Sequence, residues 1–105
     1  MTDNKRAPWT LEDLRAYREQ ILALAEQYGA YDVRVFGSVA RGEAEANSDV
    51  DFMVKFRSGA SLWDAVGLWQ DLQALLGCKV SLVSEDDRQA RERFMRRARQ
   101  DEVML

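Results

Sequence analysis

The stretch FGSVARGEAEANSDVDFMVKF, residues 36–56, decides how this 105-residue chain folds. It opens on the pair Gly37-Ser38 and continues to Asp49-Val50-Asp51, where an alternating apolar segment begins. Residues 49–56 are predicted to form a strand, because every second side chain is apolar. The two aspartates lie two positions apart, so both side chains are expected on the same face of that strand.

Paired carboxylates on one strand face point to a cation. They repel each other unless a positive charge lies between them. The chain has no histidine, which excludes imidazole-based zinc sites and Ser-His-Asp or Cys-His chemistry. A site built from oxygen ligands favours Mg²⁺ or Mn²⁺. We therefore expect Asp49 and Asp51 to bind a divalent cation.

The residues before the aspartates have the properties of a phosphate cradle. A predicted strand, residues 31–36, runs directly into Gly37 and Ser38. Glycine lets a ligand approach the backbone closely, and N–H groups and a serine hydroxyl can donate hydrogen bonds to phosphate. Arg41 can neutralise phosphate charge, and Gly42 lets the chain turn away. A cradle followed by a metal site is suited to phosphoryl or nucleotidyl transfer.

Each of these features taken alone has a simpler structural interpretation. A Gly-Ser pair is usually a turn, an Asp-x-Asp pair is usually a solvated strand edge, and a single arginine is usually a surface charge. Their order, and their place between two predicted strands, favours the functional interpretation.

The rest of the chain predicts alternating helices and strands. A helix is expected from Thr10, with Asp13 completing a capping box, to Gly29. A short helix is expected at residues 39–43. The remaining elements are a helix capped by Ser61 and running to Leu76, a strand at residues 79–83, and a last helix capped by Ser84. This order implies an α/β (α+β) sandwich, a small sheet covered by helices.

Apolar spacing predicts which side chains are buried. In the first strand these are Tyr31, Val33 and Val35, and in the helix after Ser61 they are Leu62, Val66, Trp69, Leu72 and Leu76. Three further apolar residues, Trp63, Leu68 and Leu75, make that helix more apolar than one core face requires. They suit either a partner-binding patch or packing between helices, and we favour packing.

Composition is that of one soluble globular domain, residues 1–105, with residues 1–8 expected to be flexible. No apolar run is long enough to span a membrane, and the amino terminus has no apolar signal region. A single cysteine, Cys78, suits the cytoplasm. The net charge of −3 disfavours direct nucleic-acid binding. Residues 88–99 carry six arginines, which could meet an acidic partner, although a solvated helix face is favoured.

The motif resembles that of a known family. Gly37-Ser38, ten intervening residues and Asp49-Val50-Asp51 resemble the signature of the DNA polymerase β-like nucleotidyltransferase superfamily. The run FGSVARGEAEANSDVDFMV resembles the minimal nucleotidyltransferases in particular. The resemblance implies a mixed three-stranded sheet flanked by about four helices. It also implies that Gly37 and Ser38 hold the nucleotide phosphates with help from Arg41, and that the two aspartates bind Mg²⁺.

The resemblance also implies a partner and a reaction. Many minimal nucleotidyltransferases are antitoxins paired with a HEPN-domain ribonuclease toxin, and several transfer AMP from ATP to a tyrosine of the toxin. The function expected for this chain is therefore that of a Mg-ATP-dependent protein adenylyltransferase antitoxin that forms a hetero-oligomer with its toxin. Its catalytic residues would be Asp49, Asp51 and Ser38.

One position departs from the family pattern. The third strand usually carries a third carboxylate, as in K-V-D-L-V, but this chain has Ser81 there. That carboxylate helps hold a second metal ion and takes the proton from the attacking hydroxyl, which serine does poorly at neutral pH. Glu85 could substitute for it, although a role in capping the last helix is favoured.

Two alternatives to the adenylyltransferase follow. Ser81 favours an antitoxin whose catalysis is weakened or lost and which neutralises its toxin by binding. The second alternative is nucleotidyl transfer to a small molecule such as an aminoglycoside. That reaction needs an additional substrate-binding domain, so a separate chain would have to supply the acceptor site.

Overall fold

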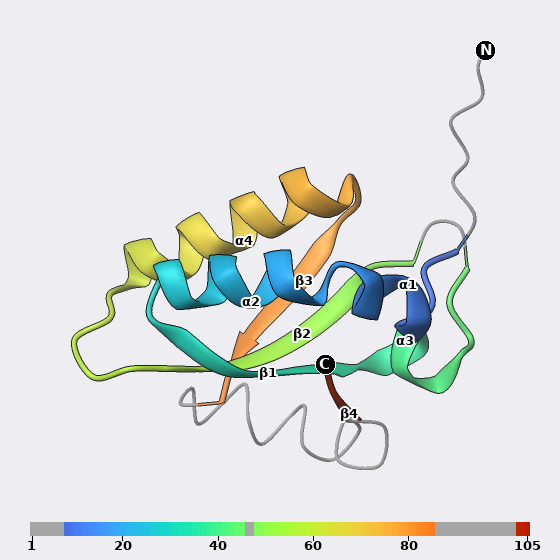
Figure 1. Ribbon diagram of the computed structural model, residues 1–105, viewed down its shortest axis with the longest axis horizontal. Helices are drawn as coiled ribbons and strands as arrows, with labels where there is room; N and C mark the ends of the chain where they lie inside the picture. Colours follow the sequence, from blue (N-terminus) through green and yellow to red (C-terminus); the bar gives the residue numbers. More distant parts are fainter. Residues whose placement is uncertain (1–7, 46–47, 86–102) are drawn as a thin grey trace.

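The computed structural model describes residues 8–45, 48–85 and 103–105. The elements, in chain order, are α1 (Leu11–Ala16), α2 (Arg18–Gln27), β1 (Ala30–Phe36), α3 (Gly37–Arg41), β2 (Val50–Phe56), α4 (Leu62–Leu76), β3 (Val80–Ser84) and β4 (Val103–Met104) (Figure 1). The predicted order of helices and strands up to residue 84 is confirmed. The helix expected after Ser84, the arginine-rich residues 88–99 and all of residues 1–8 except Pro8 lie outside the described residues.

The sheet is mixed and has the strand order β3-β2-β1-β4. Strand β1 pairs antiparallel with β2 and β4, and β2 pairs parallel with β3. The sequence predicted three strands, and the structure adds β4. This fourth strand pairs only Arg34 with Met104 and Val35 with Val103. Two residues are too few to show strand periodicity, which is why the sequence did not reveal it.

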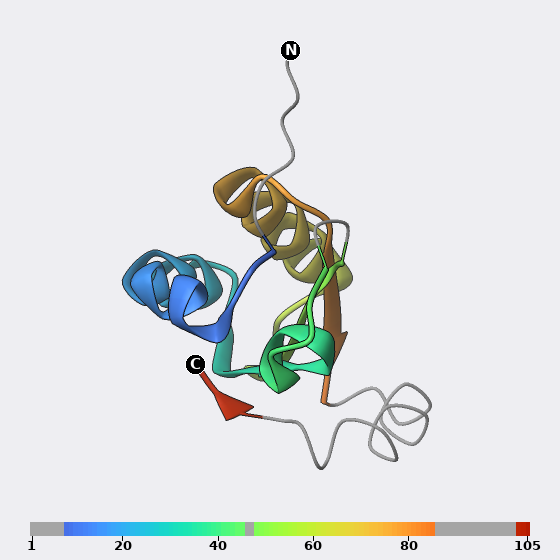
Figure 2. The same cartoon turned by 90° about the vertical axis from the view of Figure 1, so that its right-hand side faces the viewer.

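Helices α1, α2 and α4 cover one face of the sheet (Figures 1 and 2). The core lies between these helices and the sheet. Its buried side chains include Leu14, Ile21, Ala25, Val35, Val50, Phe52, Val54, Leu68, Leu72 and Leu76. Helix α3 sits at the end of β1 and connects it to the loop that leads into β2. The predicted α/β architecture is therefore confirmed.

The amino-terminal helix starts as predicted but is divided in two. The Thr10 hydroxyl accepts a hydrogen bond from the Asp13 N–H at 3.0 Å, and the Thr10 N–H donates to the Asp13 carboxylate at 3.2 Å. This is the expected capping box. At Tyr17 the backbone leaves the helical conformation, with φ −99° and ψ 10°, and the Tyr17 ring packs edge-on against Trp9.

In β1 the prediction for Tyr31 is wrong. Its side chain is 42% exposed, whereas Val33 and Val35 are buried. The register with β2 shifts between Tyr31 and Arg34, and Asp32 within this irregularity has φ 51°. A bulge breaks the two-residue alternation, so side chains before and after it no longer share a face.

In α4 the predicted buried stripe is partly wrong. Leu62 is 76% exposed and Trp69 is 39% exposed, while the fully buried side chains are Leu68, Leu72 and Leu76. Leu68 therefore belongs to the core, and Trp63 is 79% exposed. The helix is apolar around most of its circumference, so periodicity alone does not select the face that packs on the sheet. Among the described residues, no helix is long and apolar enough to span a membrane.

Candidate active site

The junction between β1 and α3 brings the backbone against a carboxylate. Gly37 follows β1 directly and has φ +76°, a conformation that residues with a side chain rarely adopt. A Cβ atom at Gly37 would overlap with Oδ2 of Asp51. Both the conformation and the close contact favour glycine, and they place the first turn of α3 against the start of β2.

Asp51 is the second residue of β2, which is an inner strand of the sheet. It pairs in register with Phe36 of β1 on one side and with Ser81 of β3 on the other. Asp49 is exposed and stands one residue before β2 begins. Burial raises the pKa of Asp51 to about 6, the negative charge of Asp49 adds to this rise, and the positive charge of Arg41 opposes it.

This electrostatic environment fits a divalent cation. The raised pKa of Asp51 means that its negative charge is not balanced by the protein around it. A cation between Asp49 and Asp51 would supply that balance, and waters and phosphate oxygens could complete its coordination. Within residues 8–45, 48–85 and 103–105, no three His, Cys, Asp or Glu side chains cluster as a metal site. The candidate protein ligands for a cation at this position are therefore Asp49 and Asp51, as the sequence predicts.

The remaining cradle residues follow along α3. Ser38 is in the first turn of this helix, where backbone N–H groups have no acceptor within the helix. The Nε of Arg41 donates to a carboxylate oxygen of Glu43 at 2.7 Å, and both side chains are exposed. Exposed ion pairs contribute little stability, so a phosphate can replace Glu43 as the partner of Arg41. Gly42 ends the helix with φ +75°.

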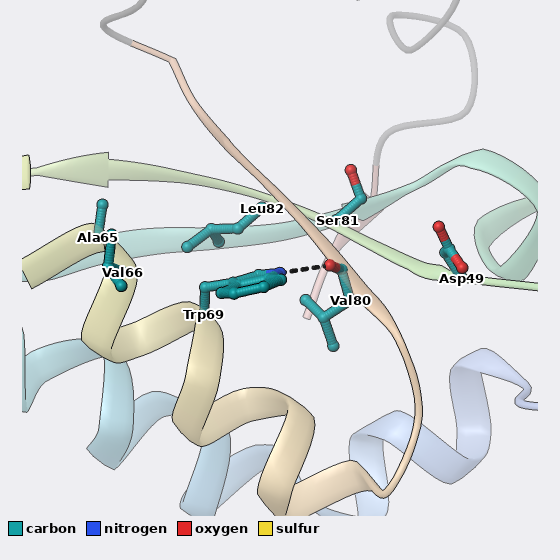
Figure 3. Close-up of a pocket in the computed structure, with 7 residues that line it drawn as sticks. All are labelled: Asp49, Ala65, Val66, Trp69, Val80, Ser81 and Leu82. Atoms are coloured by element: carbon teal, nitrogen blue, oxygen red, sulfur yellow. Dashed lines mark hydrogen bonds between the residues drawn. The ribbon is translucent and has the colours of Figure 1, made fainter.

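Ser81 occupies the position where the family pattern has its third carboxylate. Neighbouring residues on parallel strands share a face, so Ser81 and Asp51 point to the same side of the sheet. Figure 3 shows the Ser81 hydroxyl pointing away from Trp69 and α4. The departure from the family pattern therefore lies directly beside the candidate metal site.

Glu85 does not substitute for that carboxylate. Its N–H donates to the Val54 carbonyl at 2.9 Å, and its carboxylate lies 3.4 Å from Nζ of Lys55. It stands four residues beyond Ser81, which corresponds to about 13 Å along an extended strand. Its expected role in capping the last helix concerns a segment outside the described residues.

The sequence did not predict a pocket that adjoins this site. The pocket has a volume of about 470 Å³ and is lined by Asp49, Ala65, Val66, Trp69, Val80, Ser81 and Leu82 (Figure 3). Trp69 lies in its wall, and its Nε1 donates to the Val80 carbonyl at 2.7 Å. The three additional apolar residues of α4, Trp63, Leu68 and Leu75, do not line this pocket, so the apolar excess of the helix was no signal for it.

Comparison with known proteins places this geometry in a family. The family described as nucleotidyltransferase domain matches residues 17–103. Protein adenylyltransferase MntA of Thermococcus cleftensis is 42% identical over 78 residues, which cover 70% of this chain and 76% of that protein.

Solved structures agree. One described as a candidate minimal nucleotidyltransferase has a TM-score of 0.77 and 45% identity, covering 91% of this chain and 96% of that chain. A chain in the complex of tri-AMPylated Shewanella oneidensis HEPN toxin with MNT antitoxin has a TM-score of 0.62 and 18% identity, covering 86% of this chain and 69% of that one. At that identity the second match shows the fold alone. The chain belongs to the nucleotidyltransferase domain family and, as its motif predicts, to the minimal nucleotidyltransferases within it.

Proposed function

We propose that this chain is a Mg-ATP-dependent protein adenylyltransferase that acts as an antitoxin by transferring AMP to a tyrosine of a HEPN-domain toxin. The observation that carries the proposal is the contact of Gly37 with Asp51, which joins the phosphate cradle to the carboxylate pair. The name of the Thermococcus relative and the composition of the Shewanella complex support the reaction and the partner. The reaction would take place in the cytoplasm.

Each site residue would have a defined role in nucleotide binding or transfer. Asp49 and Asp51 would hold Mg²⁺, which neutralises charge on the triphosphate. The N–H groups of the first turn of α3 and the Ser38 hydroxyl would bind the β- and γ-phosphates, and Arg41 would exchange Glu43 for a phosphate oxygen. The tyrosine oxygen then attacks the α-phosphorus, the bond to the bridging oxygen breaks, and pyrophosphate leaves.

Proton removal from the tyrosine is the weak step in this proposal. A positioned general base contributes a factor of roughly 10²–10⁴ to such reactions. Ser81 stands where that base is expected, and its hydroxyl is not a base at neutral pH. We therefore expect slow transfer.

The serine at position 81 also favours a second candidate function, an antitoxin that acts by binding alone. Ser81 would then mark a nucleotide site that has lost its catalytic role. The exposed Trp63 side chain suits contact with a partner protein.

One experiment separates the two candidates. Labelled Mg-ATP is supplied to the chain together with a co-expressed HEPN-domain toxin, and label in that toxin is measured. The Asp49→Ala/Asp51→Ala variant is the control. Label that requires both aspartates supports the transferase. Neutralisation of the toxin without label, and equally by the double variant, would establish a binding antitoxin.

A further inference from the structure

The direction from which the acceptor reaches the site follows from the strand order. This inference rests on the proposed function. In the order β3-β2-β1, the cradle residue Gly37 lies on the β1 side of Asp51, and Ser81 lies on the β3 side. The attacking and leaving oxygens are roughly in line across the transferred phosphorus. With pyrophosphate held on the β1 side, the acceptor hydroxyl must approach from the β3 side, where the pocket lies.

Among the described residues, β3 is the edge strand on that side. The Val50 N–H donates to the Lys79 carbonyl at 3.1 Å, and the Glu85 N–H donates to the Val54 carbonyl at 2.9 Å. In a parallel ladder, alternate residues turn both backbone groups toward the neighbouring strand. Residues 79, 81, 83 and 85 therefore face β2. Val80 and Leu82 turn their N–H and carbonyl groups outward.

These two outward-facing residues differ. The Val80 carbonyl accepts from Nε1 of Trp69 at 2.7 Å, and the Val80 N–H donates to Oε1 of Gln73 at 3.1 Å. Side chains of α4 thus pair with both outward backbone groups of Val80. Within the part of the chain that the structure describes, neither outward group of Leu82 has a hydrogen-bond partner. An unpaired N–H and carbonyl on an edge strand can hydrogen-bond to an added strand.

Apolar side chains line the approach to this edge. Ala65 and Val66 of α4 face the pocket together with Leu82 of β3 (Figure 3). In the pocket wall, the large Trp69 side chain is 39% exposed. Exposed apolar side chains beside an open strand edge favour a protein partner with apolar side chains over a small polar molecule.

We propose that an extended segment of the acceptor protein adds to the sheet at Leu82 and delivers its hydroxyl side chain to Asp49. The segment would exchange two backbone hydrogen bonds with Leu82, and its apolar side chains would pack against Val66 and Trp69. Trp69 and Gln73 of α4 already pair with the outward groups of Val80. The backbone of the added segment would therefore leave the sheet at Val80, and only its hydroxyl-bearing side chain would continue along the pocket. A helical segment cannot offer its backbone groups to Leu82.

Amide hydrogen exchange tests this contact without relying on catalysis. The exchange rate of the Leu82 N–H is measured in the chain alone and in its complex with the HEPN-domain toxin. We expect exchange at least tenfold slower in the complex. Unchanged exchange in a formed complex, or failure of the two proteins to form one, overturns the docking proposal. AMP transfer, measured separately on the same samples, reports on the proposed function.

Two variants test the groove by a second route. Leu82→Pro removes the outward N–H and spares the ladder with β2, since proline is tolerated at strand edges. Val66→Arg places a charge in the apolar wall, and Ala74→Arg on the α2 side of the same helix is the matched control. We expect Leu82→Pro and Val66→Arg to raise the Kd for the toxin at least tenfold without changing the affinity for Mg-ATP. The control Ala74→Arg should keep the wild-type values of both. A Kd that stays at the wild-type value in folded Val66→Arg contradicts the proposal.

Discussion

Gly37 and Asp51 approach each other so closely that there is no room for a side-chain carbon between them. The two residues belong to different elements, α3 and β2, and the contact fixes the position of the cradle relative to the carboxylate pair. A side-chain carbon placed between them would move the proposed phosphate-binding backbone away from the proposed cation site. The contact therefore makes a sharp prediction about substitution at Gly37.

We expect Gly37→Ala to lower Mg-ATP affinity at least tenfold, measured by calorimetry. A left-handed backbone costs a residue with a Cβ roughly 1–2 kcal/mol. We expect Gly37→Ala to lower the free energy of unfolding by more than this amount, because of the added overlap with Asp51. Gly77→Ala is the matched control, because Gly77 has φ +67° and open space around its Cβ position. Equal loss of stability in the two variants, with nucleotide affinity retained, would contradict the overlap with Asp51.

The raised pKa of Asp51 predicts how stability depends on pH. Its folded-state pKa is about 6 against an ordinary value of 3.8, so folding disfavours the charged carboxylate. Without metal, the free energy of unfolding should fall as pH rises from about 4 to about 6. Since the side chain is only partly buried, we expect Asp51→Asn to stabilise the metal-free protein at pH 8 by about 1–2 kcal/mol.

Chemical denaturation in EDTA at pH 4 and pH 8 measures this effect. Adding Mg²⁺ at pH 8 should raise the Tm of the wild-type protein and leave that of Asp51→Asn nearly unchanged. A variant that is less stable than wild type in EDTA at pH 8 would show that the charge of Asp51 is already balanced within the protein.

Ser81 gives a prediction about catalysis. Because Ser81 pairs in register with Asp51, an aspartate there would point to the same face and restore a third carboxylate. We expect Ser81→Asp to raise the rate of AMP transfer by a factor of ten or more, measured as labelled AMP on the toxin under single-turnover conditions. Ser81→Asn has a similar size and no charge, so it should give no gain. Equal rates for both variants would mean that Ser81 does not limit catalysis.

The packing of α2 on α4 gives a prediction about stability alone. A Cβ at Gly67 would lie 2.5 Å from Cε1 of Tyr28, whose hydroxyl donates to Asp71 at 2.6 Å. Helix propensity by itself would make Gly67→Ala stabilising by about 1 kcal/mol. We expect the overlap to win and the substitution to destabilise the protein by about 1–3 kcal/mol in urea denaturation.

The double variant Tyr28→Leu/Gly67→Ala tests the cause of that loss. Removing the ring should make Gly67→Ala less costly than it is in the wild-type background. The same cost in both backgrounds would locate the strain elsewhere in α4.

Much of the local structure could be predicted because its causes lie within a few residues. The capping box at Thr10 and the one at Ser61 each depend on a side chain three positions away, and both are present. The alternation of Asp49, Val50 and Asp51 likewise depends only on the pleat of one strand. Such patterns depend on residues within a few positions of one another, and tertiary packing did not change them.

The sequence by itself thus determined the order of elements, the family motif and the pairing of two aspartates beside a glycine–serine turn. Tertiary structure alone decided that Leu68 and not Trp69 faces the core, that Asp51 pairs in register with Ser81, and that, among the described residues, the outward backbone groups of Leu82 have no partner. Each of these depends on the register and packing of segments far apart in the chain. Periodicity within a segment carries information about its own faces but none about which neighbour covers them.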